Sequence, residues 1–155
     1  MTYWIFKTEP SGYSIDDLKS DKKTVWSGVR NYQARNMLRD EVKKGDVVIF
    51  YHSSCAVPAA VGVAEVTKTG FPDETQFDPK SHYFDATAKK ENPRWFVVEV
   101  KFKEKFAQEV PLAEMRKARL LADLRLLAPG NRLSLFPVSK THFELITKMG
   151  NAEKI

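Results

Sequence analysis

The sequence predicts an α+β domain in which short helices pack outside a small mixed β-barrel of about five or six strands. Three observations support this class. The chain has 155 residues and 43% hydrophobic residues, which suits one compact domain with a single core. Strand-like and helix-like segments follow each other in mixed order. They do not alternate with long helices, as a doubly wound parallel sheet would require.

The first elements are marked by alternation and by a helix cap. Hydrophobic side chains alternate in residues 3–6, which predicts a strand, and residues 10–12 break it with Pro, Ser and Gly. Ser14 and Asp17 then form a capping-box pattern that predicts a short helix over residues 15–19. Residues 26–28 are expected to form a second short extended segment.

A longer helix is predicted over residues 32–43, with Gly45 as its C-terminal cap. Its apolar stripe has helical spacing and consists of Ala34, Met37, Leu38 and Val42. The unbroken apolar run at residues 47–51 predicts a buried strand. Another strand follows at residues 60–67, where Gly62 indicates a bulge or a close approach of another backbone.

Residues 68–93 carry weak signals and read as a long loop, which in a small domain is typical of a functional segment. Residues 95–103 then alternate as in a half-exposed strand, with Phe96, Val98, Val100 and Phe102 on one face.

The C-terminal part combines short helices with one strand. Two helices are predicted at residues 112–118 and 120–128, the second ended by Pro129-Gly130. A last strand at residues 133–138 contains Pro137, which indicates a sheet edge or a bulge. Thr141 and Glu144 form a capping-box pattern for a final helix that extends to Met149 and is closed by Gly150.

Composition limits the classes of function. A net charge of +5 suits a polyanionic partner, but many other proteins share it. The single cysteine, Cys55, permits neither an internal disulfide nor a thiolate zinc site, which fits a reducing compartment. Because no signal peptide or membrane span is visible, we expect a cytoplasmic protein, nuclear in a eukaryote. We expect a monomer without a cofactor.

No catalytic motif is visible. His52, His82 and His142 are far apart and fit no metal-ligand spacing, and the sequence has no Gly-rich phosphate loop. The run Ser53-Ser54-Cys55 could suggest a nucleophile, but a polar strand end explains it better, since spacing assigns it no base. The sequence therefore predicts neither catalytic nor metal-binding residues.

A short segment has the chemistry of a base pocket. Nucleobases are held by aromatic stacking and by hydrogen bonds to their edges. Trp26, Ser27, Gly28 and Asn31 supply an indole, a hydroxyl, an approachable backbone and an amide. The candidates for phosphate or backbone contact are Lys7, Arg30, Arg35 and Arg39. A core tryptophan and a solvated arginine face remain the alternative interpretations.

Several motifs resemble the EVE domain family across nearly the whole chain. They include Trp4-x-x-Lys7-Thr8-Glu9-Pro10, the run from Trp26-Ser27-Gly28-Val29-Arg30-Asn31-Tyr32 to Asn36, Gly45-Asp46, Gly62-Val63-Ala64-Glu65-Val66, Asn92-Pro93-Arg94-Trp95 and Arg132-Leu133-Ser134-Leu135-x-Pro137-Val138. The resemblance implies a single EVE domain over residues 1–155, with a PUA-like mixed pseudo-barrel. It also implies likeness to YTH domains, which hold a methylated adenine of RNA in an aromatic cage.

The resemblance implies roles for individual residues. Trp26 would be one wall of the cage, Ser27 and Asn31 would contact the base, and Ser53 and Ser54 would line the pocket floor or rim. Tyr83 is the candidate for the second wall, with Phe84 in reserve, because His82-Tyr83-Phe84-Asp85 departs from the family's Pro-Tyr-Tyr-Asp pattern. Trp4 and Trp95 are expected in the core.

The sequence leaves three functions open. The first is a non-catalytic reader of a modified base in DNA or RNA. The second is an enzyme acting on a nucleotide or RNA, in which His52 or Glu9 would titrate in the pocket. The third is a generic RNA-binding accessory domain, whose binding would fall with salt and ignore base chemistry.

Overall fold

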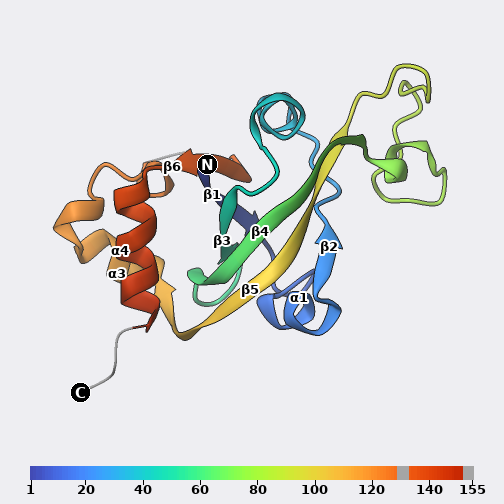
Figure 1. Ribbon diagram of the computed structural model, residues 1–155. Helices are drawn as coiled ribbons and strands as arrows, with labels where there is room; N and C mark the ends of the chain where they lie inside the picture. The colour runs from blue at the N-terminus through green and yellow to red at the C-terminus, as the bar shows by residue number, and fades with distance from the viewer. Residues whose placement is uncertain (129–132, 152–155) are drawn as a thin grey trace.

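A six-stranded mixed sheet forms the centre of the computed structural model, which describes residues 1–128 and 133–151 (Figure 1). The strand order is β2-β5-β4-β3-β1-β6, where β1 and β3 are parallel and the other pairs are antiparallel. The strands are β1 (Tyr3–Thr8), β2 (Lys23–Val25), β3 (Val47–His52), β4 (Ala59–Pro72), β5 (Phe96–Pro111) and β6 (Leu135–Val138). The predicted α+β class is confirmed, but β2 and β6 are free sheet edges and the barrel is not closed.

Short helices surround this sheet. They are α1 (Ile15–Asp21), α2 (Tyr32–Asn36), the π-helical turn η1 (Met37–Glu41), α3 (Leu112–Lys117) and α4 (Lys140–Asn151), with 3₁₀ turns at η2 (Glu74–Phe77), η3 (Arg119–Leu121) and η4 (Arg125–Leu127). Figure 1 shows α3 and α4 at one end of the molecule and the loop that joins β4 to β5 at the other. In the described part of the chain, no helix combines the length and apolarity needed to cross a membrane.

The core is anchored by a buried carboxylate near the start of β1. Asp46, 2% exposed, accepts hydrogen bonds from the Trp4 indole Nε1 (3.0 Å), the Thr2 backbone N–H (2.9 Å) and the Lys43 backbone N–H (2.9 Å). Trp4 is buried, as predicted for a core tryptophan. Because β1 lies between β3 and β6, this cluster fixes the strand that leads to Lys7 and Glu9.

Several local predictions are confirmed. Ser14 and Asp17 form the capping box of α1. The predicted stripe of the helix after residue 32 is buried: Ala34, Met37, Leu38 and Val42. Pro137 lies on the edge strand β6, where its missing N–H leaves no unpaired ladder position. Gly62 lies at a register shift, and a Cβ there would be 2.4 Å from the Glu104 carbonyl oxygen.

Other boundaries differ because pairing between distant strands overrides local patterns. The short strand after α1 is β2 at Lys23–Val25, so residues 26–28 leave the ladder after one bond from Trp26 N–H to the Val98 carbonyl (2.8 Å). The helix at residues 32–43 ends at Glu41 after a π-helical turn, and Gly45 instead turns the chain into β3 with φ +91°. Both β4 and β5 are longer than predicted, because each supplies the other's hydrogen-bond partners.

The C-terminal predictions need three corrections. Residues 120–128 form two separate 3₁₀ turns instead of one helix, and Pro129-Gly130 lies outside the described residues. The first turn of α4 is capped by the Ser139 hydroxyl, which accepts from the His142 N–H (3.0 Å), so Thr141 and Glu144 do not form its capping box. Gly150 lies within α4 as a packing residue, since a Cβ there would be 2.4 Å from Phe106 Cγ.

Candidate functional site

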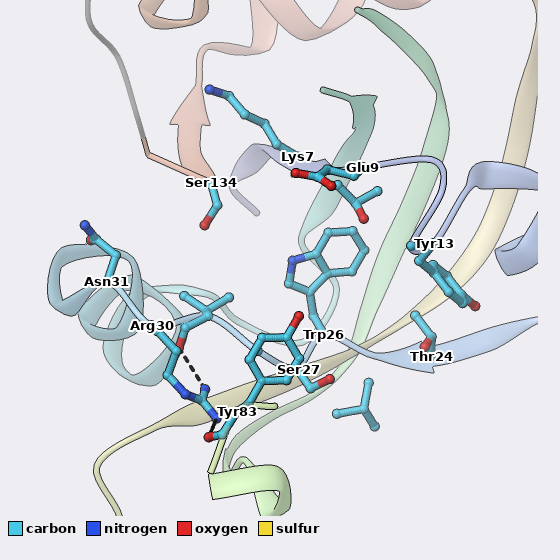
Figure 2. Close-up of a pocket in the computed structure, with 15 residues that line it drawn as sticks. Lys7, Glu9, Tyr13, Thr24, Trp26, Ser27, Arg30, Asn31, Tyr83 and Ser134 are labelled. Atoms are coloured by element: carbon cyan, nitrogen blue, oxygen red, sulfur yellow. Dashed lines mark hydrogen bonds between the residues drawn. The ribbon is translucent and has the colours of Figure 1, made fainter. Parts of the chain in front are cut away.

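A surface cavity of about 680 Å³ lies where three chain segments meet (Figure 2). The end of β1 and the turn after it form one side, and the segment from β2 to the start of α2 forms another. Tyr83 reaches in from the β4–β5 loop, and Ser134 adds to the rim before β6. This volume falls within the range of about 300–1,000 Å³ that is typical of small-molecule sites.

Trp26 joins the cavity to the core. Its ring centroid lies 5.2 Å from that of Phe6 and 5.4 Å from that of Phe50, the latter in an edge-on arrangement. The side chain is only 8% exposed, yet it lines the cavity, and Figure 2 shows the indole at the centre of the lining residues. Trp26 therefore packs in the core, as the alternative interpretation expected, and also borders the cavity, where its role in base binding stays a prediction.

Tyr83 is an aromatic residue on the opposite side of the cavity from the core, and its ring lies directly over Gly28. A Cβ on Gly28 would be 2.7 Å from Tyr83 Cζ, and the backbone φ of Gly28 is +81°. Any other residue would clash with the Tyr83 ring and strain the backbone. Trp26 and Tyr83 thus come from distant parts of the sequence, and only glycine at position 28 permits their present arrangement.

Arg30 ties the Tyr83 segment to the body of the domain. Its Nη2 donates to the Tyr83 carbonyl oxygen (2.7 Å) and to Thr75 Oγ1 (3.2 Å), and its Nη1 donates to Asp73 Oδ2 (3.1 Å) and the Val29 carbonyl oxygen (3.0 Å). Figure 2 draws the two backbone contacts as dashed lines. Arg30 lines the cavity, but its hydrogen bonds point into the protein.

Asp73 is the buried partner of this group, at 1% exposure. It accepts from the Gly28 N–H (2.8 Å), from Arg30 and from both the hydroxyl and the N–H of Thr75. Burial opposes its ionisation, but the hydrogen bonds from Thr75, Gly28 and Arg30 outweigh burial and hold the pKa of Asp73 below its usual 3.8. The carboxylate therefore stays charged and keeps its donors in place.

Gln76 organises the rest of the loop. It is fully buried, and its amide nitrogen donates to the carbonyl oxygens of Asp73 and Trp95 (2.8 Å each). Its amide oxygen accepts from the N–H groups of Arg94 (3.0 Å) and Trp95 (2.9 Å). Trp95 is buried, as predicted, and its indole donates to Asp85 Oδ2 (2.8 Å). The loop that carries Tyr83 is thus held together by hydrogen bonds around the buried Gln76 side chain.

The polar lining comes mainly from the segment after β2. Ser27 is exposed at the cavity, and its hydroxyl is directed into the group of lining residues in Figure 2. Asn31 uses its side-chain oxygen to cap α2 by accepting from the Ala34 N–H (2.9 Å). The Asn31 amide nitrogen remains as a donor at the edge of the cavity.

Lys7 supplies a cation at the opposite rim. Burial lowers the pKa of its ammonium group, whose Nζ lies 5.8 Å from the centre of the Phe136 ring. Within the described residues, no carboxylate lies within 4 Å of this ammonium, whereas Arg30 is paired with Asp73. Lys7 thus adds a positive charge to the rim of the cavity.

Five sequence-predicted site residues do not line the cavity. Ser53 and Ser54 follow β3, where the Ser53 N–H donates to the Thr8 carbonyl (2.9 Å) and Ser54 turns the chain with φ +52°. Phe84 is 42% exposed but lies outside the lining. Arg35 contacts the Tyr32 ring and the Arg94 carbonyl, and Arg39 pairs with Asp40 on the surface of η1. Ser53, Ser54 and Phe84 thus lie outside the cavity, and Arg35 and Arg39, predicted as phosphate contacts, lie beside it on α2 and η1.

His52 and Glu9 are the two residues predicted to titrate if the protein were an enzyme, and His52 lies outside the cavity lining. Its Nε2 accepts a hydrogen bond from the Ile15 N–H (3.1 Å) at the start of α1. Burial lowers the pKa of His52 below 6.5, which favours this neutral acceptor form. Glu9 does line the cavity. Among the described residues, no cluster of three His, Cys, Asp or Glu side chains could hold a metal.

Sequence reasoning missed Tyr13, Thr24 and Ser134 in the lining and Asp73 and Gln76 behind it. Tyr13 and Thr24 gave no signal, because their position depends on how α1 returns the chain to β2. Asp73 with Thr75 did carry one, since Asp followed two residues later by Thr is typical of a side-chain-stabilised turn.

The fold and the cavity together define a small ligand-binding module lined by three aromatic side chains, Tyr13, Trp26 and Tyr83, together with polar groups and the cations of Lys7 and Arg30. The chain belongs to the EVE domain family, whose model matches residues 2–149. This confirms the resemblance seen in the sequence.

Known proteins are similar over almost the whole chain. Thymocyte nuclear protein 1 of Gallus gallus is 36% identical over 166 residues, which cover 95% of this chain and 68% of that protein. A Leishmania major hypothetical protein is 41% identical with a TM-score of 0.91, covering 97% of this chain and 94% of that one. The human THYN1 protein, solved in complex with 5-methylcytosine-containing DNA, is 34% identical with a TM-score of 0.89, covering 99% of this chain and all of that one.

Proposed function

We propose that this chain is a non-catalytic nucleic-acid-binding module that holds one modified nucleobase in the Trp26–Tyr83 cavity. The observation that carries this proposal is the cavity itself, in which two aromatic side chains from distant segments border polar groups. The human THYN1 complex makes 5-methylcytosine in DNA the first base to test. Such a base must leave the duplex stack, because a cavity of about 680 Å³ has room for a base and not for a duplex.

We assign roles within the cavity as follows. Trp26 and Tyr83 offer aromatic surface to the base, and Ser27, the Gly28 backbone and Asn31 offer hydrogen bonds to its edge. Lys7 offers its ammonium to a neighbouring phosphate. Because one chain supplies every lining residue, the module is proposed to act as a monomer. We further propose that it acts where nucleic acid is found, in the nucleus of a eukaryote or the cytoplasm of a bacterium.

The proposed test compares the two neighbouring aromatic residues of the loop. Tyr83 and Phe84 are equally exposed, at 41% and 42%, but only Tyr83 lines the cavity. Binding of labelled duplexes with one central cytosine or 5-methylcytosine is followed by fluorescence anisotropy. We expect the wild type to prefer the methylated duplex, since one methyl group in a fitted pocket is worth about 1–3 kcal/mol.

Tyr83→Ala is expected to weaken binding of the methylated duplex by about five- to 150-fold, the range for one stacked base. Phe84→Ala should leave it within about twofold, because surface substitutions away from a site usually cost less than about 0.5 kcal/mol. Equal loss in both variants would contradict the cavity as the binding site. Repeating the titration with other modified bases and with RNA identifies the preferred ligand.

The alternatives have distinct outcomes in the same experiment. Binding that ignores methylation and falls steeply with salt would indicate a generic accessory domain. Conversion of the bound base, detected by mass spectrometry, would indicate an enzyme, and Glu9 would then be the first residue to substitute because it lines the cavity.

A further inference from the structure

We propose that Arg30 is a positioning residue that, with Asp73, fixes Tyr83 at the cavity and thereby sets how sharply the site discriminates between bases. This inference rests on the proposed function, and it differs from the role that charge alone suggests for Arg30. A basic residue at a nucleic-acid site is normally expected to contact phosphate. The contacts of Arg30 point to a different role.

Most of the guanidinium N–H groups of Arg30 already donate hydrogen bonds within the protein. A guanidinium has five of them in a fixed plane, and four are directed to Val29, Asp73, Thr75 and Tyr83. The shortest of these bonds, 2.7 Å, ends on the backbone carbonyl of Tyr83 itself. A phosphate could take these donors only if the loop released them.

The Arg30 guanidinium also packs against two aromatic rings. The guanidinium carbon lies 5.4 Å from the centre of the Tyr83 ring and 5.2 Å from that of the Trp95 ring. Stacking of this kind holds both the cation and the aromatic side chains in place. Arg30 therefore contacts Tyr83 at the ring and at the backbone, while Trp95 connects the same cation to the base of the loop.

The Arg30–Asp73 ion pair joins the Trp26 side of the cavity to the Tyr83 side. Asp73 Oδ2 accepts from both the Gly28 N–H and Arg30 Nη1. Gly28 lies on the Trp26 side and directly beneath Tyr83. The carboxylate thus sets the position of the backbone under the ring, and the arginine sets the position of the ring above that backbone.

The charges around the cavity also indicate a positioning role for Arg30 and a phosphate-contacting role for Lys7. Arg30 and Asp73 form an ion pair that is 23% and 1% exposed at its side chains, so the pair adds little net charge to the cavity. Among the cations that line the cavity, Lys7 has no such partner within the described residues. Lys7 should therefore account for the salt-dependent part of binding near the base, and Arg30 should not.

The test uses Arg30→Lys, which keeps the charge but loses the planar fork of donors. The matched control is Arg39→Lys, on the surface of η1 and outside the cavity. For each variant, the affinities for methylated and unmethylated duplexes are measured over a range of salt concentrations. Lys7→Gln serves as the reference for loss of a phosphate contact.

Arg30→Lys is expected to reduce the preference for the methylated duplex towards that of Tyr83→Ala while leaving the salt slope unchanged. Lys7→Gln should lower that slope by about 0.9, the value for one phosphate contact in B-DNA. In the double variant Arg30→Lys/Tyr83→Ala, the second substitution should add little, because both act on the same wall. A reduced slope with an intact preference for Arg30→Lys, or additive losses in the double variant, would overturn the inference.

Amide hydrogen exchange on the free protein separates this inference from the proposed function. Loss of the Arg30 contacts should speed exchange at residues 81–85, whether or not any nucleic acid binds. Faster exchange in Arg30→Lys together with a wild type that ignores methylation would refute the proposed function and keep the positioning role. Unchanged exchange would refute the positioning role alone. Thr75→Ala, which removes one acceptor of Arg30, provides a milder variant if Arg30→Lys fails to fold.

Discussion

Gly28→Ala is the most direct test of the contact between Gly28 and Tyr83. The added methyl group would lie 2.7 Å from Tyr83 Cζ and 2.9 Å from both Cε atoms. Carbon atoms in favourable contact are about 3.5–4.0 Å apart, so the ring must move by roughly 1 Å. Because Tyr83 is 41% exposed, we expect its ring to move towards solvent.

The cost to stability has one main source. An alanine at φ +81° adopts a left-handed conformation, which costs about 1–2 kcal/mol. The clash adds little, because a half-exposed ring moves more easily than a core side chain. For a domain of this size, about 1 kcal/mol corresponds to roughly 2–4 °C in the unfolding midpoint, so we expect a decrease of about 2–8 °C.

Gly45→Ala is the matched control. Gly45 has a similar backbone conformation, with φ +91°, but a Cβ there would meet nothing within 4 Å. Both variants should therefore lose similar stability in thermal or urea unfolding. Only Gly28→Ala should also lose affinity for the methylated duplex, by the same order as Tyr83→Ala, about five- to 150-fold.

The comparison has a clear refuting result. If Gly28→Ala kept its affinity and base preference at a temperature where it is fully folded, the position of Tyr83 over Gly28 would be irrelevant to binding. If Gly45→Ala lost affinity to the same extent, the effect of Gly28→Ala would reflect general destabilisation.

Two further predictions concern the scaffold. Gly150→Ala should destabilise the fold by about 1–3 kcal/mol in urea unfolding, because the new Cβ would lie 2.4 Å from Phe106, whereas Gly12→Ala meets only ordinary contact at 3.5 Å and should show no such loss. His52 has a folded pKa below its unfolded 6.5, so its unfolded form binds more protons and stability should fall as the pH drops below about 6.5 towards the folded pKa. His52→Gln, which keeps an acceptor for the Ile15 N–H, should flatten this part of a pH–stability curve, and an unchanged curve would contradict the assignment.

The sequence predicted elements whose cause is local. The Ser14 capping box needs only residues within one helical turn, and it is present as predicted. The strand at the start of the chain alternates within a few residues and is also present. By contrast, the extension of β5 to Pro111 depends on pairing with β4, and charged residues such as Glu104 and Lys105 gave no local signal for it.

In the site, too, features with a local cause could be predicted and features that depend on distant residues could not. The segment 26–31 was predicted to contribute to a base pocket, and all six of its residues line the cavity, because neighbouring residues of one short segment lie close together. Ser53 and Ser54 do not line the cavity, because the composition of a strand end does not tell where the next turn directs the chain. The position of Arg30 could be predicted, but its partners could not, since Asp73 and Tyr83 are more than 40 residues away along the chain.

Trp26 and Tyr83, the two aromatic residues proposed to contact the base, are held by different kinds of structure, and this has a consequence for specificity. Trp26 packs on Phe6 and Phe50, so replacing it would also disturb the core. Tyr83 is held by polar contacts from Arg30 in a loop with its own buried core around Gln76. Changes in that loop can alter the shape of the cavity without removing core packing. Base preference should therefore be adjustable through the β4–β5 loop, whereas Trp26 is constrained by both stability and binding.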